Sequence, residues 1–217
     1  MDDLILYHGS QKIVNKPEYK AGYEHNDYGQ GFYMTEHIEL AKEWAVTESD
    51  DGFVNKYSLN TDGLNILNLS DKDYNILHWL ALLVNYRQIR LSTPIMKEGA
   101  KWLISNYLIS LDDVDMIIGY RADDSYFSFA RSFLSNEISL EQLSRAMKLG
   151  KLGEQYVLKS KRAFDRIKFI GFENCDSSEY YAKRMKRDSE ARAEYQKEAD
   201  QIYINGVYIR DLIRKDK

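Results

Sequence analysis

The chain has 217 residues, of which 44% are hydrophobic and 29% are charged, and its formal net charge is −4. This composition can bury a core, so it excludes a disordered chain, and the length fits one domain over residues 1–217. The acidic balance argues against long-range attraction to bulk nucleic acid. Because Cys175 is the one cysteine, no internal disulfide can form.

The N-terminus lacks the basic region of a signal peptide, and no stretch reaches the ~18 apolar residues that a membrane span needs. We therefore expect a cytoplasmic protein that does not enter a membrane. No CxxC or HExxH motif occurs, and the four histidines are scattered, so no metal site is expected.

The N-terminal part predicts strands at 4–7, 32–34 and 53–59, where short apolar runs lie between turn formers. Gly9 and Ser10 are expected to end the first strand. Thr35 can cap the helix that follows the second strand. In that helix the apolar residues recur at helical spacing on one face: Ile38, Ala41, Trp44 and Ala45.

The middle of the chain, about residues 70–149, is mainly helical in pattern. Helices are predicted at 70–90, 94–108, 123–134 and 139–149, with one strand at 114–120. Ser70 with Asp73, and Ser139 with Gln142, have the spacing of a capping box, and Gly150 can end the last of these helices.

The C-terminal part predicts strands at 154–159 and 167–173, a charged helix at 178–199, and a hairpin at 202–209. The hairpin is predicted because Asn205-Gly206 suits a two-residue turn. Strands at both ends and helices between them indicate an α+β fold with a helical insertion.

Two aromatic residues and a histidine near the N-terminus suggest a ligand site. His8 ends a buried strand and can bond a ligand hydroxyl, although a structural histidine fits the same pattern. Tyr33 and Trp44 could enclose a flat ring between them, whereas Trp44 also fits the core face of its helix. The 27–31 segment, DYGQG, could bind phosphate, but it precedes a strand and so is not a Rossmann fingerprint.

Two further groups of polar residues follow strand-like runs. Glu154 and Gln155 are adjacent on a strand, so only one of them can face the same cleft as His8. A carboxylate there could hold a ribose hydroxyl and stabilise an oxocarbenium-like centre, whereas an amide carries no charge. Substrate-binding residues are also expected after strand 114–120, at Arg121, Asp123 and Asp124, and Asp123 could equally cap the next helix.

The segments LYHGS, DYGQGFYMTEHIELAKEWA and EQYVLKS together resemble the ADP-ribosyltransferase superfamily. The likeness is to the diphtheria-toxin and poly(ADP-ribose) polymerase branch with its His-Tyr-Glu triad, and it implies a split β-sheet core and NAD as substrate. The resemblance assigns the ribose to His8, the nicotinamide amide to Gly9, and stacking on nicotinamide to Tyr33 and Trp44. Ser10 and Gly31 adjoin these residues and are counted with the NAD-binding set.

At the third triad position the chain departs from the pattern, because Gln155 stands where the family has glutamate and Glu154 lies one residue earlier. The catalytic set implied is His8, Tyr33 and either Gln155 or Glu154. The segments WLALLVNYR, DMIIGYRADDSYF, KLGEQYVLKSKRAFDRIKFIGFE and VYIRDLIR resemble a bacterial domain family of unknown function. That family is placed in the same superfamily, carries Gln at this position, and is linked with toxin–antitoxin or phage-defence loci.

These resemblances imply an NAD-dependent mono-ADP-ribosyltransferase, a toxin or effector that modifies a protein or nucleic acid, with an antitoxin or immunity partner. The helices in 70–149 and the loop 15–26 are where contacts with the acceptor are expected. Three alternatives stay open: an NAD glycohydrolase, a non-enzymatic NAD- or ADP-ribose-binding module, and an interaction protein that binds through helix 178–199.

Overall fold

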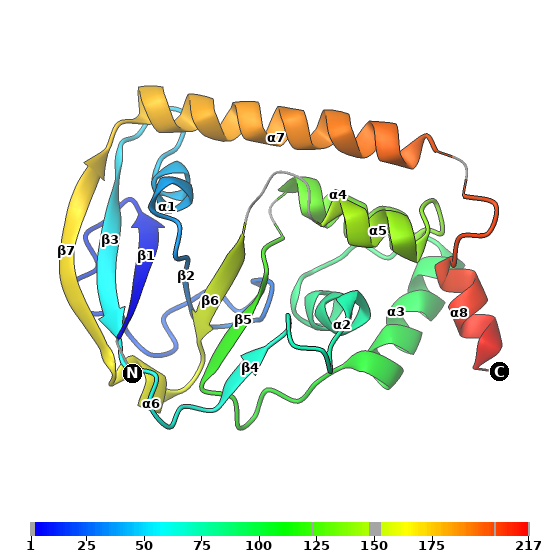
Figure 1. The fold of residues 1–217 in the computed structure, drawn as a ribbon, viewed down its shortest axis with the longest axis horizontal. Coiled ribbons are helices and arrows are strands. Elements are labelled where there is room, and N and C mark those ends of the chain that lie inside the picture. The colour runs from blue at the N-terminus through cyan, green and yellow to red at the C-terminus, as the bar shows by residue number, and fades with distance from the viewer. Residues whose placement is uncertain (1–2, 123, 148–152, 202, 217) are drawn as a thin grey trace.

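The computed structural model describes residues 3–122, 124–147, 153–201 and 203–216 and contains two small β-sheets, the first of which lies at one end of the molecule (Figure 1). The first sheet is antiparallel, in the order β1 (Leu4–Ser10), β3 (Gly52–Leu59), β7 (Ile167–Cys175). The second has the order β2 (Phe32–Met34), β6 (Glu154–Leu158), β5 (Met116–Tyr120), β4 (Ile66–Asn68), and only its β4–β5 pair is parallel.

A β-bridge joins β1 of the first sheet to the residue that follows β2 of the second. Tyr7 of β1 donates its N–H to the Thr35 carbonyl at 2.8 Å and accepts the Thr35 N–H at 2.9 Å. The sheets also share a core, since one buried cluster takes Leu6 and Tyr57 from the first sheet and Met34 and Tyr156 from the second. The α+β fold predicted from the sequence is therefore confirmed.

The helices gather mainly beside the second sheet. They are α2 (Ile76–Tyr86), α3 (Pro94–Tyr107), α4 (Asp124–Leu134), α5 (Leu140–Ala146) and α8 (Ile209–Lys215). Helix α1 (Ile38–Ala45) packs on β1 and β3, and α6 (Lys161–Phe164) is a short helix before β7. The largest buried cluster lies among these helices and the second sheet, with Trp79, Phe129 and Phe133 at its centre.

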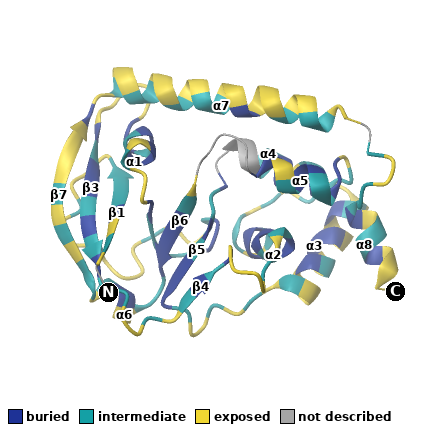
Figure 2. Cartoon of the chain, viewed as in Figure 1, coloured by how far each residue is buried: buried dark blue, intermediate teal, exposed yellow. Residues whose placement is uncertain are grey.

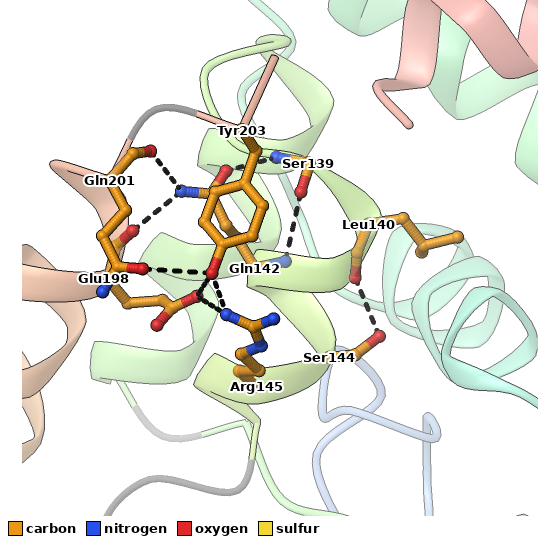
Figure 3. Close-up of polar contacts among 8 residues, drawn as sticks. All are labelled: Ser139, Leu140, Gln142, Ser144, Arg145, Glu198, Gln201 and Tyr203. Atoms are coloured by element: carbon orange, nitrogen blue, oxygen red, sulfur yellow. Dashed lines mark hydrogen bonds and ion pairs between the residues drawn. The ribbon is translucent and has the colours of Figure 1, made fainter. Parts of the chain in front are cut away.

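Helix α7 (Ser177–Ala199) crosses from the first sheet to the helical group, and its surface is mostly exposed (Figures 1 and 2). At its middle Arg187 Nε donates to Glu43 Oε2 of α1 at 2.8 Å. Its end is held against α5, where Gln142 Nε2 donates to the Glu198 and Gln201 carbonyls at 2.8 and 3.3 Å (Figure 3). Helix α7 therefore links α1 to α5.

Several predicted boundaries need correction. The helix expected at 70–90 begins only at Ile76, because Asn75 caps it with His78, and Ser70 instead donates to Glu154. Thr35 is not the N-cap residue of α1, because the helix begins only after His37; the Thr35 hydroxyl instead accepts from the His37 N–H at 3.2 Å.

Strand β1 does not stop before Gly9 and Ser10 but includes both. A Cβ on Gly9 would lie 2.0 Å from the Ala41 carbonyl oxygen, so glycine there lets α1 pack directly on the strand. The capping box of Ser139 and Gln142 is confirmed at the start of α5, while the stop predicted at Gly150 lies outside the described residues.

The hairpin predicted at 202–209 is wrong. Gly206 N donates to the Tyr203 carbonyl at 3.0 Å, so a turn forms over residues 203–206, one residue before the predicted one, and the chain then enters helix α8. Asp211 accepts from the Tyr208 N–H at the start of this helix, and Ile209 and Ile213, one turn apart, are buried. Burying the apolar face of α8 stabilises the chain more than the preference of Asn205-Gly206 for a hairpin turn does. No helix among the described residues is long and apolar enough to cross a membrane.

Candidate functional site

A cavity of about 460 Å³ lies where the two sheets and the 14–31 loop meet. Its volume is in the range of small-molecule sites. The side chains that decide its chemistry come from strands of both sheets, from the loop, from the end of α2 and from the residue after β5: His8, Asp27, Tyr33, Arg87, Arg121 and Gln155. Three residues predicted from separate parts of the sequence, at positions 8, 33 and 155, are thus brought together.

The ring of His8 is fixed by the neighbouring strand. Its Nδ1 lies 2.7 Å from the Tyr33 carbonyl oxygen, which can only accept, so Nδ1 carries the proton and Nε2 of the neutral ring is an acceptor. Burial lowers the pKa of His8, although the hydrogen bond to Tyr33 opposes this. At neutral pH the group therefore offers a hydrogen-bond acceptor and no charge.

The hydroxyl of Tyr33 is used within the protein. It donates to the Gly29 carbonyl at 2.6 Å and accepts the Tyr28 N–H at 3.1 Å. Burial raises the pKa of Tyr33, so the hydroxyl stays protonated. What this residue contributes to the cavity is therefore its ring, held in place by two hydrogen bonds to the loop.

Gln155, and not Glu154, faces the cavity. Gln155 is 3% exposed, and its Nε2 donates to Asp27 Oδ2 at 2.9 Å and to the Tyr120 carbonyl at 3.0 Å. Glu154 points to the other face of β6, where its Oε1 accepts from the Ser70 hydroxyl. The pleat of the strand separates the two side chains, so the cavity has a carboxamide at the third triad position.

Asp27 and Arg87 line the cavity although the sequence singled out neither side chain, and Asp27 was included only within the candidate phosphate-binding segment 27–31. The carboxylate of Asp27 is 5% exposed, lies on the cavity wall, and accepts from Gln155 and from the Ala122 N–H, the latter at 2.9 Å. Arg87 Nη1 lies 3.3 Å from Oδ1. Burial raises the pKa of Asp27, while these hydrogen bonds and the nearby arginines oppose the shift. In the sequence Asp27 looked like one more turn former, and no local signal marked it as buried.

The two rings expected to enclose a ligand do not both face the cavity, because only Tyr33 lies on its wall. Trp44 is absent from the wall, and the guanidinium carbon of Arg121 lies 3.5 Å from the centroid of its indole ring. Arg121 itself does line the cavity. The Arg121 guanidinium thus makes a cation–π contact with the Trp44 indole, which was expected to stack on a ligand ring.

The other predicted residues are divided between the wall and its surroundings. Gly31 lines the cavity, and a Cβ there would lie 2.6 Å from Val157 Cγ1. Gly9 and Ser10 are not on the wall, since Gly9 contacts α1 and the Ser10 hydroxyl accepts from the Lys12 N–H at 3.2 Å. Asp123 lies outside the described residues, and Asp124 begins α4.

Lys159 holds the loop that carries Asp27. Its Nζ donates to the carbonyl groups of Tyr28 and Gln30, both at 2.6 Å, and burial lowers the pKa of Lys159 to about 8. The segment 27–31 therefore turns two carbonyls toward this lysine. Within the described residues, no three side chains of the types His, Cys, Asp and Glu gather as a metal site would need.

Comparison with known families finds that the family described as "Protein of unknown function (DUF3990)" matches residues 4–169. The matched segment contains every residue of the cavity wall and ends within β7, before α7 and α8. No curated protein matches the chain.

Proposed function

The chain belongs to this family, the proteins of unknown function DUF3990, and from the geometry of its cavity we propose that it is an NAD-dependent ADP-ribosyltransferase. The observation that carries the proposal is the meeting of His8, Tyr33 and Gln155 in one cavity, although they come from strands far apart in the sequence. These are the positions that the His-Tyr-Glu resemblance singles out.

The nicotinamide ring would lie on the ring of Tyr33, since the hydroxyl of that residue is engaged elsewhere. The resemblance assigns the amide group of nicotinamide to the backbone of Gly9, which adjoins the cavity wall and does not line it. Tyr7 turns its backbone N–H and C=O toward Thr35. Successive residues of a strand direct these groups to opposite edges, so the backbone N–H and C=O of Gly9 point to the same edge as those of Tyr7. The cavity wall begins at the neighbouring His8.

The ribose and diphosphate of NAD match other groups of the wall. Nε2 of His8 can accept a hydrogen bond from a ribose hydroxyl, because Nδ1 already holds the ring proton. The guanidinium groups of Arg87 and Arg121 complement the negative charge of a diphosphate.

In the reaction the bond between the ribose C1′ and the nicotinamide nitrogen breaks, and its electron pair leaves with nicotinamide. A nucleophilic group of the acceptor then bonds to C1′ and loses its proton to water. A protein or nucleic acid as acceptor would fit a toxin or effector, while water as acceptor would make the protein a glycohydrolase. Positioning and charge stabilisation supply most of the catalysis.

A second candidate, an NAD- or ADP-ribose-binding module without turnover, is favoured by one observation. The third triad residue is a neutral carboxamide whose Nε2 is already bonded to Asp27 and Tyr120. Such a group adds no charge to stabilise an oxocarbenium-like centre.

The test is to incubate the purified chain with NAD labelled in its adenylate group and to measure nicotinamide release, label transfer to protein or nucleic acid, and binding by calorimetry. We expect release, lowered at least about 100-fold by His8→Ala, as for loss of an oriented ligand contact. Lys186→Ala, on the exposed surface of α7, is the control and should leave release unchanged.

Release without label transfer would identify a glycohydrolase. Binding without release would identify a binding module. If neither binding nor release is detected with the folded chain, the proposed function is wrong.

A further inference from the structure

Asp27 has a carboxylate oxygen that the protein leaves incompletely satisfied. Oδ2 accepts from the Ala122 N–H and from Gln155 Nε2, both at 2.9 Å. Oδ1 is buried, and among the described residues nothing forms a hydrogen bond with it, although Arg87 Nη1 lies 3.3 Å away. A buried carboxylate oxygen without a hydrogen bond is costly, so its place on a cavity wall needs a reason.

Fastening the loop does not supply that reason. Oδ2 alone makes the hydrogen bonds of Asp27 with Ala122 and Gln155, and Lys159 holds the following residues of the loop through the Tyr28 and Gln30 carbonyls. Burial also raises the pKa of Asp27, which means that the folded protein pays for the negative charge. Positive charge that develops in the cavity would lower this cost.

We propose that Asp27 provides the carboxylate of the reaction and that Gln155 positions it; this inference rests on the proposed ADP-ribosyltransferase function. The negative charge thus lies on the loop and not on β6, on a carboxylate that is hydrogen-bonded to the residue at the third triad position. Asp27 is the catalytic residue in this assignment because it meets the ribosyl centre, and Gln155 acts through Asp27.

In the transfer step the C1′–N bond of NAD breaks and both its electrons go to the nicotinamide nitrogen, which loses its positive charge. That charge passes to C1′ and the ring oxygen of the ribose, where the Asp27 carboxylate stabilises it. A nucleophilic O–H or N–H group of the acceptor, or water, bonds to C1′. Its proton passes to Asp27 and from there to solvent, so charge and atoms balance.

This arrangement explains why residue 155 is a glutamine. A glutamate there would place a second carboxylate beside Asp27 Oδ2 and opposite the Tyr120 carbonyl, at the 2.9 and 3.0 Å that Nε2 now spans. Like charges so close cannot both stay ionised at low cost. A carboxylate on the loop and one on β6 are therefore alternatives, and exchanging them should keep one charge at the site, although the Tyr120 carbonyl loses its donor from residue 155.

The experiment compares wild type, Asp27→Asn, Gln155→Ala and the exchange variant Asp27→Asn/Gln155→Glu, with NAD as the probe. For each chain the kcat and KM of nicotinamide release, the Kd of NAD by calorimetry, and the melting temperature are measured. We expect Asp27→Asn to lower kcat at least about 100-fold and KM to change less than about fivefold. Gln155→Ala should lower kcat about 10-fold and likewise change KM less than about fivefold. The kcat of the exchange variant should be at least about 10-fold higher than that of Asp27→Asn.

A merely structural Asp27 would lower the melting temperature without this split between kcat and KM. If Asp27→Asn keeps kcat within about threefold of wild type, or if the folded exchange variant binds NAD and stays as slow as Asp27→Asn, the inference is overturned. If Asp27→Asn does not fold, the exchange variant decides alone: with NAD bound, a kcat less than about 100-fold below wild type supports the inference, and a lower kcat overturns it. Absence of nicotinamide release from wild type overturns the proposed function and this inference together, whereas an active wild type with an equally active Asp27→Asn overturns only the role of Asp27.

Discussion

Changing Gln155 to glutamate should make the stability of the protein depend on pH. In the wild type Nε2 lies 2.9 Å from Asp27 Oδ2. Two unit charges at that separation repel by about 6 kcal/mol at an effective dielectric constant of about 20. Arg87 offsets part of this, but at 3.3 Å from Asp27 Oδ1 it already faces one carboxylate. The folded variant should therefore retain a proton that the unfolded chain has released.

The size of the effect follows from proton linkage. Free glutamate has a pKa of about 4.3, so the unfolded chain has lost this proton above about pH 5. Each pH unit over which the folded pair keeps the proton lowers the free energy of unfolding by about 1.4 kcal/mol. A carboxyl group whose pKa is raised by folding destabilises the folded state as the pH rises. The deficit of the variant in free energy of unfolding, relative to wild type, should therefore grow by about 4 kcal/mol between about pH 5 and pH 8. For a chain of this size that corresponds to roughly 8–16 °C in melting temperature.

The assay is thermal and urea unfolding of wild type, Gln155→Glu and Gln155→Met at both pH values. Gln155→Met is the matched control, because it removes the donor to Asp27 and Tyr120 without adding charge. Its deficit should be about 1–3 kcal/mol at either pH. If the deficit of Gln155→Glu is the same at both pH values, the reasoning about this pair is refuted.

Three further substitutions test how the site is supported. Gly9→Ala puts a Cβ 2.0 Å from the Ala41 carbonyl oxygen, so α1 must shift, and urea unfolding should show a loss of about 1–3 kcal/mol or more. Lys159→Met leaves two backbone carbonyls of the loop beside the cavity without their charged donor, which should cost about 1–3 kcal/mol and speed hydrogen exchange in that loop. Glu43→Leu breaks a nearly buried ion pair with Arg187 and should cost about 3 kcal/mol, measured by urea unfolding.

Each of these variants has a control within the chain. A Cβ on Gly171 would meet nothing within 4 Å, so Gly171→Ala should not reproduce the loss at Gly9. Lys168→Met changes an exposed lysine of β7. Glu190→Leu breaks an exposed pair with Lys186, 3.9 Å long, and should cost less than about 0.5 kcal/mol. Equal losses in a variant and its control would show that the named contact is not the cause.

The sequence by itself determined the features that depend on neighbouring residues. The α+β pattern, the proline start of α3 and the capping box of Ser139 with Gln142 were all predicted, because caps and apolar periodicity act within a few residues. The strand pleat also required that only one of Glu154 and Gln155 face the cleft.

The tertiary structure alone decided which contacts form between distant parts of the chain. Asp27 meets Gln155 across 128 residues, and no local pattern distinguishes such an aspartate from a turn former. The guanidinium of Arg121 takes the face of Trp44, and burial of Ile209 and Ile213 makes a helix where the turn residues favoured a hairpin. In each case the free energy of burying and pairing side chains across the fold exceeds the local preference, so the outcome depends on neighbours that the sequence does not place.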